Sequence, residues 1–138
     1  MKYVLWLLTM LPAAGQCLRY ETPVHLKGRL ILQDENGYRQ YFVFNPEKPI
    51  CTLATPGDDL TQACDEITDL QVWPTDSEPS DRLERLVSQR VSVQGTLIPH
   101  TTGYHRTAVL IEISSVEPMD EAGKRALRVP SAERGPCL

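Results

Sequence analysis

The chain has 138 residues, of which 41% are hydrophobic and 23% charged, and its formal net charge at pH 7 is −4. This acidic balance argues against nucleic acid as the main partner, because phosphate binding needs an excess of Lys and Arg. Eleven prolines and eight glycines favour many turns and short strands, and the length suits one domain with one core.

Residues 1–15 have the composition of a secretory signal peptide. Lys2 gives a positive start, residues 3–11 are almost entirely apolar, and small residues close the segment. The apolar run is far shorter than the roughly 20 residues that span a bilayer. We therefore expect cleavage, no later transmembrane segment, and a periplasmic or secreted protein. A buried helix is one alternative. A lipid anchor on Cys17 is another, although Gln16 is larger than the residue that lipoprotein signals place there.

The first β-hairpin is expected over residues 24–32 and 38–44. Apolar residues alternate along the first segment, which indicates a strand with one face towards a core. The Asn-Gly pair at 36–37 is a strong hairpin signal, so the turn is centred near residue 36. The expected cross-strand pairs are Leu30–Phe42 and Gly28–Phe44.

Four cysteines in an exported chain predict disulfides. Cys17 precedes the first strand of the hairpin and Cys51 follows the second, so their bridge is favoured because hairpin ends are neighbours. Cys64 and Cys137 are then left to pair with each other or to stay free. No zinc site is predicted, since the cysteines form no CxxC pair and the histidines lack finger spacing.

The middle of the chain predicts a loop, a strand and a helix. Residues 53–66 read as a polar loop, and residues 67–73 as a third strand with Leu70 and Val72 facing inwards. A short helix is expected from Ser80, as its capping residue, to about residue 89.

A second hairpin is expected over residues 91–97 and 109–113, with its turn centred on Gly103. Gly28 and Gly95 are expected at bends where the sheet curls into a barrel. The tail, residues 118–138, has no apolar period. The expected cross-strand pairs are Leu97–Val109, Gly95–Ile111 and Val93–Ile113.

The order of expected elements is three strands, a helix and two strands. A short helix between the third and fourth strands of a five-stranded chain is the arrangement of an OB-fold barrel. The predicted fold is therefore an all-β, OB-like barrel over residues 16–117, followed by a polar tail. A small β-sandwich is the alternative.

Several segments resemble one protein family. They are residues 17–21 (CLRYE), 24–28 (VHLKG), 48–51 (KPIC), 91–97 (VSVQGTL), and 100–105 (HTTGYH) with 109–110 (VL). They are similar to an uncharacterised family of exported bacterial proteins, the domain of unknown function family 4431. The resemblance covers residues 17–117. It implies export and the Cys17–Cys51 bridge, and it implies no activity. The chain departs from the family in its shorter first hairpin, Cys64, and the tail with Cys137.

The outward face of the first three strands is the first candidate binding surface. OB barrels commonly bind along strands two and three, with aromatic side chains as stacking platforms and cations beside them. Arg29, Tyr41 and Trp73 are the candidate contact residues, and a plain solvated sheet face is the alternative. The expected outward residues are His25, Lys27, Arg29, Arg39, Tyr41, Val43, Gln71 and Trp73.

The turn between the last two strands is the second candidate, with His100, Tyr104 and His105. This loop often borders the ligand site of an OB-fold, and paired imidazoles can bind a transition metal or titrate near neutral pH. His100 is expected on the outward side of its strand and His105 in the turn, so the two need not converge. A polar turn or a partner-contact loop is expected, and no metal.

No catalytic motif is recognised, since no serine lies in a nucleophile elbow and oxidised cysteines are not nucleophiles. The leading hypothesis is an exported, non-catalytic binding module of the cell envelope, without a cofactor. Its partner is an exported protein or a cell-wall glycan, and an inhibitor-like protein is one specific form of this hypothesis. The alternative is an OB domain that binds a metal or small ligand through the His100–His105 turn. An enzyme is the third hypothesis.

Overall fold

The structure, a computed structural model, describes residues 17–35, 39–74, 79–102 and 104–119. The expected signal peptide, residues 1–15, lies outside these ranges, as does the tail after Met119. No helix in the described ranges has the length and apolar character that a membrane span requires.

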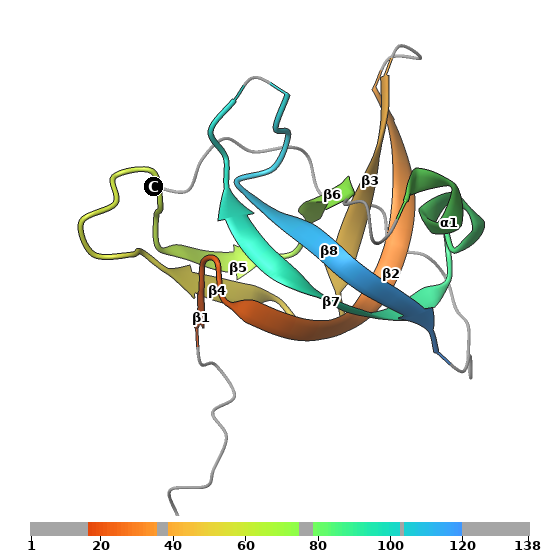
Figure 1. The fold of residues 1–138 in the computed structure, drawn as a ribbon, viewed down its shortest axis with the longest axis horizontal. Helices are drawn as coiled ribbons and strands as arrows, with labels where there is room; N and C mark the ends of the chain where they lie inside the picture. The colour runs from red at the N-terminus through yellow and green to blue at the C-terminus, as the bar shows by residue number, and fades with distance from the viewer. Residues whose placement is uncertain (1–16, 36–38, 75–78, 103, 120–138) are drawn as a thin grey trace, which may run out of the picture.

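Five strands close into a barrel in the order β2-β3-β6-β8-β7 (Figure 1). Neighbouring strands are antiparallel, except that β6 and β8 are parallel. This topology, with one helix between the third and fourth barrel strands, confirms the predicted OB-like barrel. The barrel elements are β2 (Pro23–Glu35), β3 (Arg39–Pro46), β6 (Leu70–Pro74), α1 (Ser80–Arg85), β7 (Arg90–Pro99) and β8 (Val109–Pro118).

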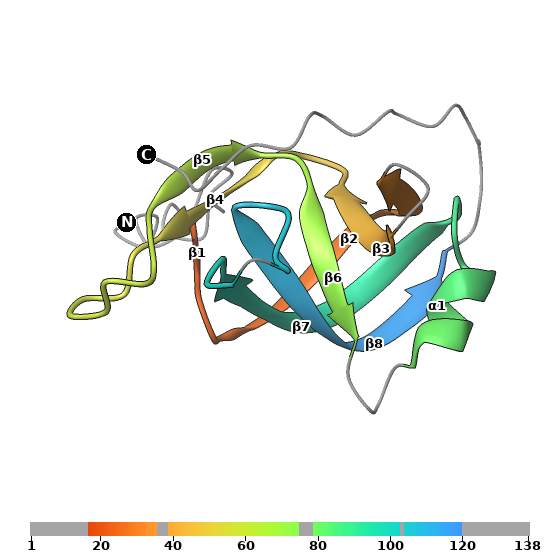
Figure 2. The same cartoon turned by 90° about the horizontal axis from the view of Figure 1, so that it is seen from above.

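A small second sheet, which the sequence did not predict, lies at the end of the barrel away from α1 (Figure 2). It contains β1 (Leu18–Arg19), β4 (Ile50–Leu53) and β5 (Cys64–Ile67) in the order β1-β4-β5. The single strand expected over residues 67–73 is therefore wrong, because β5 ends at Ile67 and β6 begins at Leu70. Ile67 and Leu70 are both buried, and a spacing of three cannot place two residues on one face of a straight strand.

Both hairpins have the predicted faces but not the predicted register. The observed pairs in the first are Leu30–Phe44 and Gly28–Pro46, and in the second Leu97–Ile111 and Gly95–Ile113. Each differs from the prediction by two residues on the second strand, and Val93 pairs with Val116 beyond a bulge. A two-residue slip leaves every side chain on its predicted face, because the side-chain period of a strand is two.

The core fills the barrel from all five strands and the helix. Leu70 and Val72 face inwards as predicted. Gly28 and Gly95 lie where strands approach closely, since an added Cβ would come within 2.1 Å of the Asn45 carbonyl oxygen and 2.2 Å of the Glu112 carbonyl oxygen, respectively. Fully buried core residues are Leu30, Phe44, Leu70, Leu83, Val91, Val93, Leu97, Val109, Ile111, Ile113 and Val116.

Helix α1 is shorter than the segment expected to run to about residue 89. Its N-cap is Pro79, which makes no side-chain cap, so the predicted capping role of Ser80 is wrong. The helix ends early because Ser88, with φ of 75°, donates its N–H to the Leu30 carbonyl at 2.6 Å. This bond draws the chain towards β2, while Leu83 and Leu86 pack into the core.

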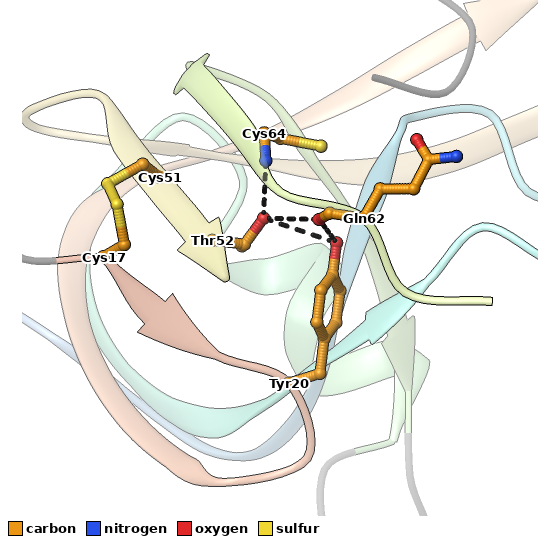
Figure 3. The surroundings of a disulfide bond; sticks show 6 residues. All are labelled: Cys17, Tyr20, Cys51, Thr52, Gln62 and Cys64. Atoms are coloured by element: carbon orange, nitrogen blue, oxygen red, sulfur yellow. Dashed lines mark hydrogen bonds between the residues drawn. A yellow bond between two sulfur atoms is a disulfide. The ribbon is translucent and has the colours of Figure 1, made fainter. Parts of the chain in front are cut away.

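A disulfide and a hydroxyl network brace the small sheet (Figure 3). The predicted Cys17–Cys51 bridge is confirmed, so the sulfur that a lipid anchor would use is already bonded. The buried Tyr20 hydroxyl donates to the Gln62 carbonyl at 2.9 Å, and the Thr52 hydroxyl accepts the Cys64 N–H at 3.1 Å. No cysteine in the described ranges is free. The Cys64–Cys137 pair stays a prediction, because Cys137 lies outside those ranges.

Candidate functional site

An open pocket of about 310 Å³ lies where β3 and β6 diverge. The two strands pair only at Val43–Gln71 and Phe44–Leu70. Beyond these pairs, residues 40–42 and 72–73 line the opening, and the β7–β8 loop and the start of α1 complete it. The lining residues are Gln40, Tyr41, Phe42, Gln71, Val72, Trp73, Ser80, Tyr104 and Arg106.

Two large aromatic side chains are exposed at this pocket. Trp73 is 37% exposed and Tyr104 is 66% exposed. Among the described residues, the other exposed large hydrophobic side chains are Leu53 and Leu60. These belong to β4 and the β4–β5 loop, which projects away from the barrel (Figures 1 and 2). The exposed aromatic surface is therefore concentrated at the pocket.

Gln71 fastens the β7–β8 loop to β6. Its side-chain oxygen accepts the Arg106 N–H, and its side-chain nitrogen donates to the Tyr104 carbonyl at 3.3 Å. Its backbone N–H donates to the Thr107 hydroxyl at 2.9 Å. Gln71 is only 4% exposed and Val43 only 2%, so the expectation that both lie on a solvated outer face is wrong. The folded-back loop accounts for the burial of Gln71.

Replacing Gln71 with leucine is expected to lower the free energy of unfolding by about 1 kcal/mol, because two partly buried backbone groups of the loop lose their partners. Urea denaturation of the variant measures this loss. The matched control is Gln94→Leu on the exposed face of β7, for which a change of less than about 0.5 kcal/mol is expected. Equal losses in the two variants would show that the Gln71 side chain does not hold the loop.

The two loop histidines converge, an outcome that the sequence analysis left open. The rings of His100 and His105 are edge to face with centroids 5.7 Å apart, and His105 contacts Trp73 at 5.1 Å in the same manner. The Nδ1 of His105 accepts the Thr101 N–H at 3.0 Å, so the ring's proton is on Nε2. The Nδ1 of His100 donates to the Thr107 carbonyl at 3.0 Å. These bonds fold the loop around the side of Trp73.

His105 is only 8% exposed, and its burial lowers the pKa from the ordinary value of 6.5. The neighbouring charge of His100 lowers this pKa further. His105 is therefore neutral at pH 7, as its acceptor role towards Thr101 requires. Within the described ranges, no group of three or more His, Cys, Asp or Glu side chains is arranged to hold a metal ion.

Stability is expected to fall as the pH drops below 6.5. The unfolded chain takes up a proton at His105 near that pH, whereas the folded chain does so only at lower pH, so acid favours unfolding in this window. The loss levels off below the folded-state pKa. Thermal unfolding at about pH 7.5 and about pH 5.5 measures it, and His105→Gln should reduce the difference between the two midpoints. His25→Gln, at an exposed site, should leave that difference unchanged; an unchanged difference in His105→Gln would contradict the assignment.

The structure brings together most of the sequence-predicted contact residues. Tyr41, Trp73 and Tyr104 line the pocket, with His105 packed against Trp73. Arg29 does not line it, because its guanidinium donates to the Ser88 carbonyl at 2.9 Å, near the end of α1. The side chain of Arg39, another expected outward residue, lies outside the description.

The sequence analysis missed Arg106, the positively charged residue of the pocket, and the role of Gln71 in anchoring its backbone. Arg106 lines the pocket, and the side chain of Gln71 places the backbone of Arg106 there. The only sequence signal for Arg106 was its position directly after Tyr104 and His105. The anchoring role of Gln71 had no local signal, because its partners lie more than 30 residues away along the chain.

A second polar contact, outside the pocket, joins β2 and β7. The Nε2 of His25 lies 2.6 Å from the Ser92 hydroxyl. A hydroxyl beside an imidazole is the nucleophile–base pair of many hydrolases, which also orient the base through a third group. Among the described residues, His25 makes no hydrogen bond to a carboxylate. We assign the pair no catalytic role and regard it as a cross-strand contact on an exposed face.

Comparison with known families confirms the resemblance in part of the chain. Residues 69–117 match the family model of a domain of unknown function, DUF4431. The matched segment runs from the start of β6 to the end of β8 and includes Trp73, Tyr104 and Arg106. No curated protein matches the chain significantly. The family match supports the resemblance and brings no activity with it.

Proposed function

We propose that this OB-like barrel, which carries the DUF4431 segment, is an exported, non-catalytic binding module of the cell envelope. Its ligand occupies the pocket between β3, β6 and the β7–β8 loop. One observation carries the proposal: the exposed side chains of Trp73 and Tyr104 both line the same open pocket. Strands two and three and the loop between strands four and five are the surfaces with which OB-folds bind ligands.

The pocket's side chains support binding rather than catalysis. Its described lining contains aromatic rings, amides, one hydroxyl-bearing serine and one guanidinium, and no carboxylate, thiol or imidazole. General acid–base catalysis requires a group whose pKa lies near the working pH. The described lining contains none of the histidine or carboxylate side chains that most often take this role.

The pocket is also held in place before a ligand arrives. The backbone of Trp73 is in register with Glu112 of β8, and its ring makes an edge-to-face contact with His105. Gln71 fixes the backbone beside Tyr104 and Arg106. A site fixed in this way loses less conformational entropy on binding, which favours affinity.

Export is supported by two independent features. The Cys17–Cys51 disulfide is of the kind that persists in oxidising compartments outside the cytoplasm. Residues 1–15 have the composition of a secretory signal. The ligand is then an exported protein or a cell-wall glycan, since those are the molecules present in the periplasm or outside the cell.

Affinity capture tests the proposed function. The purified, disulfide-bonded protein is used as bait for cell-envelope extract, beside a Tyr41→Ala, Trp73→Ala double variant and a Leu60→Ala control. Leu60 is 62% exposed, close to the 66% of Tyr104, but it lies in the β4–β5 loop and does not line the pocket. We expect the parent and the control to retain the same glycan or protein and the double variant to lose it. Equal capture by all three would place the binding face elsewhere, and no capture by any would contradict a binding module.

A further inference from the structure

We infer that the ligand is a linear oligosaccharide without acidic groups, which lies across the strands from Trp73 into a second pocket on the outside of β2, β7 and β8. The inference rests on the proposed function, and it adds the chemical class of the ligand and a further binding subsite. The second pocket has a volume of about 510 Å³. Its lining includes Pro23, Gln94, Thr96 and Glu112.

One row of outward-facing side chains joins the two pockets. Trp73 of β6 is in register with Glu112 of β8, which is in register with Thr96 of β7. Thr96 is in register with Pro23 of β2. These four residues, the outer row, are all exposed or half-buried. Trp73 lines the first pocket and the other three line the second, so one extended molecule can contact both pockets.

The outer row is long enough to bind a chain of several sugar rings. Neighbouring strands of a sheet lie about 4.8 Å apart, so the row spans about 14 Å from β6 to β2. The two residues on either side of Glu112, Ile111 and Ile113, are buried in the core, so the side chain of Glu112 points outwards. The row therefore follows the outer surface of the barrel.

The folded-back β7–β8 loop forms one border of the outer row. Leu110 lies two positions before Glu112 and hence on the same outer face, but it is fully buried and is not part of the core cluster. Leu110 is in register with Gln71, whose side chain holds the loop. The loop thus accounts for the burial of Leu110 and leaves the adjacent outer row open.

The second pocket offers partners for hydroxyl groups. Among the described residues, the half-buried Glu112 carboxylate makes no hydrogen bond or ion pair, and the Thr96 hydroxyl makes no hydrogen bond. A carboxylate accepts hydrogen bonds, and a hydroxyl both donates and accepts them, so sugar hydroxyls can satisfy both groups. Glu112 is the one carboxylate in the described lining of this pocket. It would repel an acidic sugar.

The ends of the outer row offer apolar surfaces. Trp73 is 37% exposed, and Pro23 presents a rigid apolar ring at the other end. The face of an aromatic ring is electron-rich, and the C–H groups on one side of a pyranose ring carry slight positive charge, so the two surfaces attract each other. Apolar rings at the ends and polar groups between them suit sugars, which have apolar faces and polar edges.

The pairing of the strands argues against a peptide ligand. An extended peptide binds a sheet by adding a strand to an exposed edge. From Trp73 to Pro23 the outer row crosses the paired boundaries β6–β8, β8–β7 and β7–β2, so it passes no strand edge. A folded protein partner would need a broad apolar centre. The exposed large hydrophobic side chains at the pockets are Trp73 and Tyr104, both at one end.

The fluorescence of Trp73 tests this inference directly. The sequence has two tryptophans, so a Trp6→Phe chain reports on Trp73 alone. We titrate it with cellohexaose and chitohexaose, with the matching disaccharides, which are too short to span the outer row, and with oligogalacturonate as the acidic counterpart. We expect a saturable change in emission with a hexasaccharide and about tenfold weaker binding of its disaccharide, which loses the hydrogen bonds of the second pocket. Oligogalacturonate should bind more weakly than that hexasaccharide.

Two substitutions place the ligand on the outer row. Thr96→Val keeps the shape of the side chain and removes its hydroxyl, so it should weaken hexasaccharide binding about threefold to tenfold. Glu112→Gln should also weaken it, and should reduce the discrimination against oligogalacturonate. Both variants should bind the disaccharide as the parent does, which also shows that they are folded. Lys27→Gln, at an exposed position of β2 outside the pocket, should change neither affinity.

Equal affinity for hexasaccharide and disaccharide, or no response to any of these sugars, would overturn the inference. So would tighter binding of oligogalacturonate, or unchanged hexasaccharide affinity in both Thr96→Val and Glu112→Gln. In each case, envelope capture that still depends on Tyr41 and Trp73 would leave the proposed function standing. Loss of that dependence as well would mean that the first pocket itself was wrongly assigned.

Discussion

Replacing both Cys17 and Cys51 with serine is expected to lower the free energy of unfolding by about 4 kcal/mol. The bridge closes a sequence separation of 34 residues, and it therefore removes much of the conformational freedom of the unfolded chain. It also holds β1, a strand of only two residues, beside β4. A domain of this size is stabilised by only about 5–15 kcal/mol, so the variant should lose a large share of its stability. Urea denaturation of oxidised wild type and variant measures the difference.

The hydroxyl network next to the bridge provides the control. Tyr20→Phe removes the hydrogen bond to the Gln62 carbonyl and leaves the disulfide in place. Its expected cost is about 1 kcal/mol. If the double serine variant costs no more than Tyr20→Phe, the disulfide is not the main brace of the small sheet.

Replacing Gly28 with alanine is expected to cost about 3 kcal/mol of stability. The added Cβ would meet the Asn45 carbonyl oxygen at 2.1 Å and the Pro46 Cα at 2.8 Å. Both atoms belong to the backbone of β3, so the clash is relieved only by moving β2 and β3 apart. That movement would open the barrel at the strand pair that buries Leu30.

Gly57→Ala distinguishes this clash from a general cost of replacing glycine. Gly57 has open space around it and a φ of 81°, so its replacement should cost only the backbone strain, about 1 kcal/mol. The two midpoints of urea denaturation are compared on the same background. A Gly28→Ala variant that is no less stable than Gly57→Ala would contradict the close approach of the two strands.

The fold was predictable because apolar residues occupy every second position in the strands that share one core. The alternation around Leu30 and Leu97 indicated the buried face, and the helix between the third and fourth strands indicated the OB-like order. The register was not predictable from this pattern, because a shift of two residues preserves every face and only the turn distinguishes the alternatives. The small sheet was missed because β1, β4 and β5 are too short to show a period.

The candidate site was predictable only in part. The positions of Tyr41 and Trp73 on adjacent strands, and of Tyr104 in the following loop, were enough to nominate them. Whether they meet depends on how the loop folds back, which is determined by hydrogen bonds from Gln71, distant in sequence. Arg29 was nominated on the same reasoning, but its guanidinium bonds at Ser88, near the end of α1.

The position of the ligand on the barrel is tested most directly by the NMR spectrum of ¹⁵N-labelled protein, recorded as captured envelope material is added. We predict that the indole N–H of Trp73 and the backbone amides of Tyr104 and Arg106 shift first, while the amide of Leu60 does not move. A second pocket, on the outside of β2 and β7, is lined by His25 and Thr96 among others. Shifts that cluster there, with the Trp73 indole unchanged, would contradict the assignment of the binding face.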